Sequence, residues 1–212
     1  MNIDTSKVYD ISMPITYDMA VYKGKEEKRP LLTAQSTFST GSAYESVITM
    51  NMHTGSHIDS KLHMIEGGAT VESLNIKELL TKCRVIDLSE CTSSIGKKAL
   101  VDKNIQSGSF LLLKTRNSTE DILEKDFIYL DRSGASYLAE MNIAGVGTDG
   151  LGIERNQIDH KTHLVLMNKG IHILEGLRLA DIKEGEYFLS ALPILIPGAE
   201  ASPIRAVLIG LN

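Results

Sequence analysis

Residues 53–63 of the chain read His53-Thr54-Gly55-Ser56-His57-Ile58-Asp59-Ser60-Lys61-Leu62-His63. The stretch contains three of the six histidines in the chain, together with one aspartate. A glycine and several small or β-branched residues disfavour a helix, so we expect an extended backbone. Because side chains alternate between the two faces of an extended segment, His53, His57 and Asp59 should point to the same side.

Two imidazoles and a carboxylate on one face make a donor set suited to Zn(II), Mn(II) or a similar first-row metal ion. Gly55 lies on the same face and leaves room between the ligands. The alternative is a loop of hydrogen-bonded polar residues, which would be the better interpretation for a lone histidine. Four ligand-type side chains within eleven residues favour the metal site, with His53, His57 and Asp59 as its ligands.

The composition is that of an ordinary globular chain. Its 212 residues are 42% hydrophobic and 23% charged, so we expect one domain, residues 1–212, that buries a sizeable core. A net charge of −5 and the absence of a basic run disfavour nucleic acid as a partner. The two cysteines, Cys83 and Cys91, form no C-x-x-C motif and are expected to be reduced.

No targeting or membrane segment is recognisable in the sequence. No apolar run has the length of a membrane span. Residues 1–7 are polar and lack the apolar core of a signal peptide. We therefore expect a cytoplasmic protein that does not bind membranes.

Strands and short helices alternate from one end of the chain to the other, with no linker between them. Helical spacing and end signals predict helices at 76–81, 133–141 and 162–168, the last of which Gly170 would end. Apolar runs predict strands at 8–12, 44–50, 84–88, 109–115, 143–147, 187–193 and 204–209. This interspersed order is typical of a mixed α/β fold.

A second group of candidate ligands lies much later in the chain. Residues 159–163 read Asp-His-Lys-Thr-His, and a segment with His172 and Glu175 follows. A second metal ion would need further ligands, which Glu175 and one of the histidines can supply. Surface histidines and glutamates are common, however, and spacing alone does not choose among His160, His163 and His172.

The chain resembles the cyclase family of metal-dependent hydrolases, which includes bacterial kynurenine formamidases and isatin hydrolases. The family signature, H-x-G-T-H-x-D-x-P-x-H, matches residues 53–63 except at the Thr and Pro positions. The similarity runs nearly end to end, and its other segments are residues 10–15, 67–71, 145–149, 163–175, 191–194 and 198–207. It implies a swivelling β/β/α fold and a homo-oligomer, either a dimer or a tetramer.

The resemblance also implies roles for the candidate residues. It gives five metal ligands: His53, His57, Asp59, His163 and Glu175. The first three would bind one ion, and the last two would bind a second ion that shares Asp59. His63 corresponds to the family's proton donor and acceptor, which leaves structural roles for His160 and His172.

Three positions depart from the family pattern. Ser56 replaces Thr and keeps its hydroxyl group. Lys61 replaces Pro; it is either an exposed loop lysine or a cation that favours an acidic substrate. Residues 22–24 read Tyr-Lys-Gly where formamidases place Trp-Pro-Gly, and the chain has no tryptophan. We expect Tyr22 and Lys61 to flank the pocket, and a substrate smaller or more polar than N-formylkynurenine.

These observations predict a metal-dependent hydrolase that cleaves the C–N bond of an aryl formamide or of a cyclic amide or imide. One or two Zn(II) or Mn(II) ions per subunit would activate a water molecule, and His63 would act as general acid and base. The alternative is a metal-binding protein of the same fold that has lost catalysis and serves in ligand binding or assembly. His63 argues against it, because a structural metal site has no need of an uncoordinated base.

Overall fold

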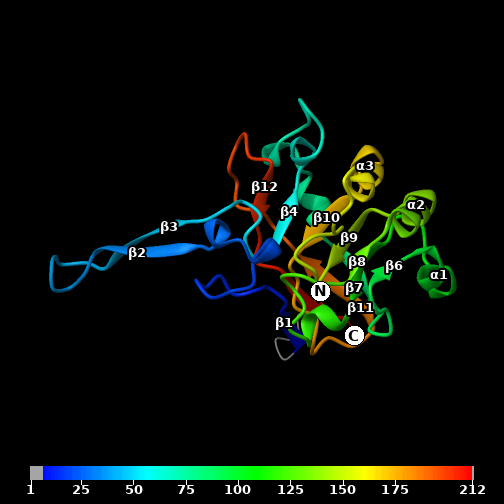
Figure 1. The fold of residues 1–212 in the computed structure, drawn as a ribbon, viewed down its shortest axis with the longest axis horizontal. Coiled ribbons are helices and arrows are strands. Elements are labelled where there is room, and N and C mark those ends of the chain that lie inside the picture. The colour runs from blue at the N-terminus through cyan, green and yellow to red at the C-terminus, as the bar shows by residue number, and fades with distance from the viewer. Residues whose placement is uncertain (1–6, 212) are drawn as a thin grey trace.

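A nine-stranded mixed sheet forms the centre of the structure, a computed structural model that describes residues 7–211 (Figure 1). Most of the polar N-terminal segment considered above, residues 1–6, lies outside the described residues. The order of strands across the sheet is β1 (Val8–Asp10), β13 (Val207–Gly210), β11 (Gly185–Ser190), β5 (Leu80–Asp87), β7 (Phe110–Lys114), β9 (Gly145–Thr148), β10 (His172–Glu175), β4 (His57–Asp59) and β12 (Ala201–Pro203).

Four parallel strands, β5, β7, β9 and β10, occupy the middle of this sheet, and antiparallel strands flank them on both sides. In β7, alternate residues enter two different cores. Leu111 and Leu113 pack into one core, and Phe110 and Leu112 pack into the other. A strand that is buried on both faces needs apolar residues at every position, which explains the run of apolar residues in β7.

Three α-helices lie on one side of the sheet (Figure 1), namely α1 (Lys97–Leu100), α2 (Arg132–Glu140) and α3 (Lys161–Asn168). Leu138 of α2 and Leu166 of α3 are fully buried in the core beneath them. Asp131 caps α2 by accepting hydrogen bonds from two backbone N–H groups of its first turn. The core on the opposite side includes Leu177 and Leu179, which belong to the connection between β10 and β11.

A two-stranded hairpin, β2 (Leu31–Ser36) and β3 (Glu45–Thr49), projects away from the body and forms a sheet of its own (Figure 1). A second small sheet pairs β6 (Ser94–Ile95) with β8 (Tyr129–Leu130). Short 3-10 turns span Tyr22–Gly24, Glu26–Lys28, Lys61–His63, Val71–Ser73, Ile76–Leu79, Val101–Lys103 and Arg116–Ser118. Over the described range, every helix falls short of the length and apolar character that crossing a bilayer requires.

The mixed α/β class expected from the sequence is confirmed. Strand β7 and helices α2 and α3 agree within one residue with the predictions at 109–115, 133–141 and 162–168. The short helix predicted at 76–81 is present as a 3-10 helix, Ile76–Leu79, and it leads into β5 as expected, although the strand begins earlier, at Leu80. The strand predicted at 204–209 begins only at Val207, the first residue of β13. The residues before it carry the chain from β12 at one edge of the sheet to β13 near the other edge. Cys83 and Cys91 are both free.

Candidate metal centre

Strands β4 and β10 place three of the predicted ligands side by side. In their antiparallel register His57 lies opposite Glu175, and Asp59 follows two residues after His57. Paired residues, and residues two apart on a strand, share a face of the sheet. Ile58 and Leu174 alternate with them and pack into the core on the far side. The three polar side chains therefore point to the side of the sheet that the helices cover, and all are buried.

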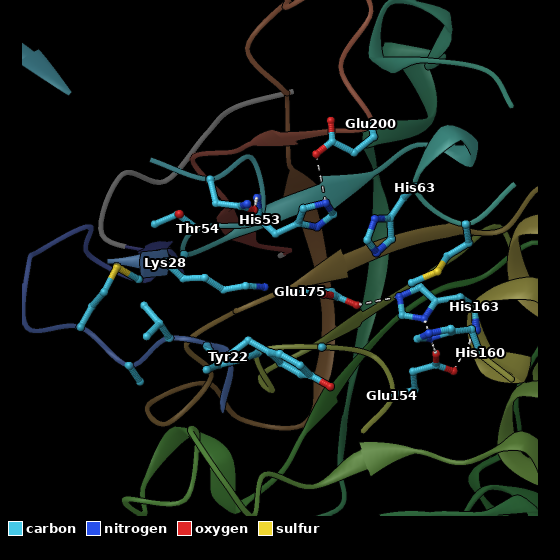
Figure 2. Close-up of a pocket in the computed structure, with 18 residues that line it drawn as sticks. Tyr22, Lys28, His53, Thr54, His63, Glu154, His160, His163, Glu175 and Glu200 are labelled. Carbon is cyan, nitrogen blue, oxygen red and sulfur yellow. Dashed lines mark hydrogen bonds and ion pairs between the residues drawn. The ribbon is translucent and has the colours of Figure 1, made fainter. Parts of the chain in front are cut away.

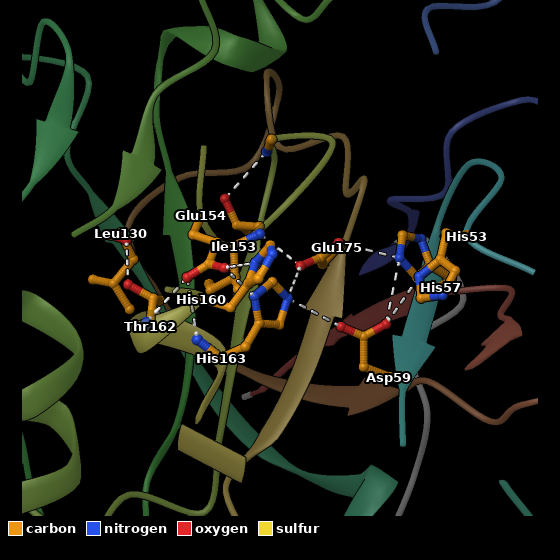
Figure 3. Close-up of polar contacts among 12 residues, drawn as sticks. His53, His57, Asp59, Leu130, Ile153, Glu154, His160, Thr162, His163 and Glu175 are labelled. Carbon is orange, nitrogen blue, oxygen red and sulfur yellow. Dashed lines mark hydrogen bonds and ion pairs between the residues drawn. The ribbon is translucent and has the colours of Figure 1, made fainter. Parts of the chain in front are cut away.

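Helix α3 brings His163 to the same place. His163 lies in the first turn of α3, and its imidazole is buried. Its Nε2 atom lies 3.5 Å from Oδ2 of Asp59 and 3.4 Å from Oε1 of Glu175. Figure 3 shows the His163 ring between these two carboxylates and the carboxylate of Glu154. The second group of candidates in the sequence thus meets the first one through His163 and Glu175.

The backbone of residues 53–56 is not extended, contrary to the expectation from the sequence. A turn forms instead, in which the N–H of Thr54 donates to the carbonyl oxygen of Asn51 at 3.0 Å. Gly55 adopts a φ of +68°, in the left-handed region that favours glycine. The carbonyl group of Gly55 is packed so closely against Gly176 that a Cβ atom at Gly176 would clash with it.

His53 consequently reaches the centre from a turn, and β4 begins only at His57. Nδ1 of His53 lies 3.2 Å from Oδ1 of Asp59. The rings of His53 and His57 meet edge to face, with their centroids 4.9 Å apart. The three side chains converge as the sequence suggested, but the alternation of one strand accounts for only two of them.

The ligand-type atoms are spaced as donors around a metal ion are. Donors at ~2.0–2.2 Å from a tetrahedral ion lie roughly 3.3–3.6 Å from one another. Five nitrogen–oxygen distances fall close to this range: 3.2 Å for His53–Asp59, 3.7 Å for His57–Asp59, 3.2 Å for His57–Glu175, 3.5 Å for His163–Asp59 and 3.4 Å for His163–Glu175.

Asp59 and Glu175 each direct one oxygen to either side of the group. Oδ1 of Asp59 faces His53 and His57, while its Oδ2 faces His163. Likewise Oε2 of Glu175 faces His57, and its Oε1 faces His163. The arrangement fits two neighbouring ion positions that share both carboxylates.

Several of these atoms are unsatisfied in the protein itself. Nε2 of His57, both carboxylate oxygens of Asp59 and Nε2 of His163 are buried and lack a hydrogen bond within residues 7–211. A buried polar atom without a hydrogen bond is unfavourable, and coordination to a cation would satisfy it. Imidazole and carboxylate donors suit Zn(II) and Mn(II), so the residues present fit a divalent metal ion.

Each imidazole turns its other nitrogen to an acceptor outside the centre. The three contacts are His57 Nδ1 to the Gly55 carbonyl oxygen at 2.9 Å, His163 Nδ1 to Glu154 Oε1 at 3.0 Å, and His53 Nε2 to Glu200 Oε1 at 3.5 Å. Among these three contacts only that of His57 has the geometry of a hydrogen bond; the two carboxylates attract a proton to the outer nitrogen by charge. A proton on the outer nitrogen leaves the inner one free to bind a metal. Sequence reasoning missed Glu154 and Glu200, because neither stands at a ligand-like spacing.

The charges of the group stabilise one another. Burial opposes protonation of His163, but the carboxylates of Asp59, Glu154 and Glu175 outweigh it and hold the pKa of His163 well above its ordinary value. Burial also opposes ionisation of Asp59, but His163 and His53 outweigh it and hold the pKa of Asp59 well below its ordinary value. The carboxylates therefore stay ionised in the interior and are available to a cation.

Three of the candidate ligands, His53, His163 and Glu175, line a cavity of about 410 Å³ (Figure 2), a volume suited to a small organic molecule. His57 and Asp59 are buried behind this lining. His63 belongs to the lining, and its ring centroid lies 4.1 Å from that of His53 and 5.5 Å from that of His163. Burial lowers the pKa of His63, so its imidazole is neutral at neutral pH and can accept a proton. Tyr22 also lines the cavity.

Lys61 does not lie where the sequence suggested. It is exposed and is absent from the cavity lining formed by the described residues. Lys61 and His63 belong to one 3-10 turn, in which residues two apart point in different directions. The turn that directs His63 inward therefore directs Lys61 away. The lysine that lines the cavity is Lys28, which sequence reasoning did not identify.

The two remaining histidines differ in their relation to the centre. His172 pairs with Glu78, with 2.7 Å between Nε2 and Oε2, and does not line the cavity formed by residues 7–211. His160 does line the cavity, and its Nδ1 lies 2.6 Å from Oε1 of Glu154. Since Glu154 also holds His163, His160 is closer to the centre than the sequence indicated.

Comparison with known proteins shows the family of the chain. The sequence model of the cyclase family matches residues 9–155, more than half of the chain. A kynurenine formamidase of Bacillus mycoides (strain KBAB4) is 34% identical over 208 residues, which are 96% of this chain and 98% of that protein.

Solved structures extend the likeness to the fold. A predicted metal-dependent hydrolase from Bacillus stearothermophilus is 45% identical and has a TM-score of 0.87, covering 96% of this chain and 98% of its own. Isatin hydrolase A from Labrenzia aggregata is 21% identical with a TM-score of 0.80, covering 95% of this chain and 93% of its own, so its likeness concerns the fold alone. Because the family model matches residues 9–155 and the kynurenine formamidase matches nearly the whole chain, the protein belongs to the cyclase family.

Proposed function

We propose that this chain is a metal-dependent hydrolase that cleaves the C–N bond of an amide, either an aryl formamide or a cyclic amide or imide. The observation that carries the proposal is the convergence of unsatisfied imidazole and carboxylate atoms directly behind a cavity that His53, His163, Glu175 and His63 line. The similarity to a kynurenine formamidase supports this class of reaction.

One or two divalent ions per subunit, Zn(II) or Mn(II), would be held by the five side chains. His53, His57 and one oxygen each of Asp59 and Glu175 face one ion position. His163 and the remaining carboxylate oxygens face the other. When bound, such an ion supplies Lewis acidity and lowers the pKa of a water molecule toward ~7.

His63 would move the protons of the reaction. Its neutral imidazole accepts a proton from the attacking water as the C–O bond forms. The resulting imidazolium then donates that proton to the leaving nitrogen, so that the C–N bond breaks and an uncharged amine departs. A ligand nitrogen could not do both, and His63 is placed beside His53 and His163 rather than between the two carboxylates.

The cavity favours a compact aromatic or cyclic substrate. Tyr22 offers a ring on which a planar substrate can stack, and its own ring lies 6.1 Å from that of Phe127. Because the chain has no tryptophan for this purpose, we expect a substrate smaller or more polar than N-formylkynurenine.

The protein would act as a homo-oligomer, a dimer or a tetramer. The β2–β3 hairpin supports this part of the proposal, because it exposes large apolar side chains, including 69% of Leu32 and 77% of Phe38. An isolated hairpin is marginally stable at best in water, so the hairpin needs a surface to pack on, and a second copy would supply it. The cytoplasmic location expected from the sequence stays a prediction.

Elemental analysis followed by a substrate screen tests the proposal. Protein purified without added metal should carry Zn or Mn at one or two ions per subunit. The loaded protein should release formate from formanilides or open cyclic imides, lose this activity to a chelator, and regain it when metal is returned. A fully loaded protein that hydrolyses neither class would refute amide hydrolysis, and a protein that binds no divalent ion would refute the metal centre.

A further inference from the structure

Lys28 is the only lysine or arginine in the cavity lining formed by residues 7–211. It ends the 3-10 turn Glu26–Lys28, and the preceding turn supplies Tyr22. The Lys28 side chain is half-buried, and its ammonium lies 5.3 Å from the centroid of the Tyr22 ring. Figure 2 shows the side chain reaching into the cavity above Tyr22, with its nitrogen directed toward Glu175 and the histidines.

Lys28 differs from its neighbours in having no carboxylate partner among the described residues. Nζ of Lys25 lies 3.9 Å from Glu27, and Nε of Arg29 lies 2.8 Å from Glu26. None of the ion pairs formed within residues 7–211 includes Lys28. Of the three cations Lys25, Lys28 and Arg29, it is Lys28 that lines the cavity.

The carboxylates of the cavity are already engaged with histidines. Glu154 faces His160 and His163, Glu175 faces His57 and His163, and Glu200 faces His53, at distances from 2.6 to 3.5 Å. A half-buried ammonium without a counter-ion is unfavourable. A divalent ion in the centre would add positive charge to the same cavity. The cavity therefore holds a positive charge that a bound anion can neutralise.

We propose that Lys28 is the anion-binding residue of the cavity, and that it binds a carboxylate carried directly on the aromatic ring of the substrate amide. The inference rests on the proposed function, of which it names the substrate class. The Lys28 ammonium lies over the Tyr22 ring, so a substrate ring that packs beside Tyr22 brings its acidic group to the ammonium. Lys28 thus takes the role that the sequence suggested for Lys61.

Pairs of substrates that differ only in the charge of one group separate binding of the carboxylate from binding of the ring and the amide. We would compare ortho-, meta- and para-formamidobenzoate with the corresponding formamidobenzamides, which are neutral and nearly isosteric. In Lys28→Met, which keeps most of the side-chain length, KM for the preferred benzoate should rise ~10–100-fold, as expected for loss of a charge-assisted hydrogen bond, with kcat little changed. The kcat/KM for the matching benzamide should change less than ~2-fold.

Lys23→Met is the matched control. Nζ of Lys23 also lies 5.3 Å from the Tyr22 ring centroid, but the residue is exposed and lies outside the cavity lining. This variant should keep the wild-type KM for both substrates. An equal loss on benzoate and benzamide in Lys28→Met would give Lys28 a packing role and overturn the inference, as would an unchanged KM for the benzoate.

A binding measurement keeps the inference separate from the proposed function. If the wild type hydrolyses neither series, the proposed amide hydrolysis fails, and calorimetric titration of the metal-loaded protein with benzoate then tests the anion site alone. Weaker benzoate binding in Lys28→Met, with Lys23→Met unchanged, supports the site. Equal affinity in all three proteins means that the carboxylate binds elsewhere, at the metal ions for example, and overturns it.

Discussion

Glu154 holds two imidazoles at once. Its Oε1 lies 3.0 Å from Nδ1 of His163 and 2.6 Å from Nδ1 of His160, while its Oε2 accepts a hydrogen bond from the N–H of Thr162 at 3.0 Å. The charge of Glu154 at 3.0 Å favours a proton on Nδ1 of His163, and the Nε2 atom faces the centre. Glu154 therefore acts on the centre by orienting one of its ligands.

Replacing Glu154 should weaken metal binding without removing a ligand. In Glu154→Gln the side chain keeps its size but loses its charge, so it no longer favours a proton on Nδ1 of His163. We expect the dissociation constant for Zn(II) or Mn(II) to rise ~10–100-fold. Glu200→Gln is the control, because Glu200 is partly exposed and 3.5 Å from His53, and its effect should stay below ~5-fold. Competition titration with a chromophoric chelator gives both constants, and equal effects would contradict the role of Glu154.

His63 should be needed for turnover and not for metal binding. Its ligand atoms lie within 4.8 Å of those of Asp59 and His163, so the structure permits either role. We expect His63→Ala to keep its metal content and to lose ~10²–10⁴-fold in kcat, as for removal of a general acid–base. His172→Ala, which alters a histidine outside the cavity, should retain full activity. Loss of metal from His63→Ala would make it a ligand, and normal turnover would remove it from the mechanism.

Metal binding should release protons near neutral pH. Burial opposes the charged forms of His57 and His163, but nearby carboxylates outweigh it and raise the pKa of both imidazoles above the ordinary value. In the metal-free protein these groups therefore hold protons that a metal must displace, since it binds the neutral imidazole. Affinity should fall as the pH is lowered from ~8 to ~6. Calorimetry in buffers of different ionisation enthalpy counts the protons, and a count of zero would contradict the raised pKa values.

At the scale of elements, the centre depends on how closely β10 approaches the turn before β4. Gly176 directly follows β10 and has a φ of +69°, and a Cβ there would clash with the carbonyl group of Gly55. The same carbonyl oxygen accepts the contact from Nδ1 of His57 at 2.9 Å. The backbone contact between Gly55 and Gly176 therefore positions two ligands: His57, which contacts the Gly55 carbonyl oxygen, and Glu175, which directly precedes Gly176.

Gly176→Ala should lower both stability and metal affinity. The strained φ and the clash together should cost about 2–4 kcal/mol in the free energy of unfolding. Gly170→Ala is the matched control, because Gly170 has a φ of +72° with no atom within 4 Å of its Cβ position. It should cost only about 1–2 kcal/mol and leave metal affinity unchanged. Urea unfolding of the metal-free proteins measures the difference, and equal losses would show that the contact with Gly55 is unimportant.

Two of the elements that the sequence predicts well bury a regular apolar pattern, whereas β3, predicted at 44–50, is exposed along its whole length. Strand β7 follows from the apolar run at 110–113, and α2 from its helical spacing. Strand β2 gives no such signal, because its side chains are mostly exposed on both faces and apolar residues therefore do not alternate with polar ones. The place of Lys28 in the cavity, and the absence of Lys61 from it, depend on the directions of short 3-10 turns, which spacing along the chain does not encode.

At the scale of the whole molecule, the hairpin stands out from the body and begins and ends at the cavity. Its first strand follows Lys28 closely and its second leads to Asn51, and both of these residues line the cavity. Leu32 and Ile48 lie opposite one another in the hairpin and are exposed. A second copy that covers this apolar pair would lie near the cavity mouth, so assembly and substrate access would be coupled.

Removing the apolar pair should dissociate the oligomer while the hairpin stays paired. In Leu32→Lys combined with Ile48→Glu, opposite charges face each other across the strands and preserve the pairing, but the apolar surface is lost. We expect light scattering to give a dimer or tetramer for the wild type and a monomer for the double variant. Ile158→Lys, which alters an isoleucine that is 98% exposed on the body, should leave the assembly intact. A monomeric wild type, or a double variant with the wild-type mass, would contradict assembly through the hairpin.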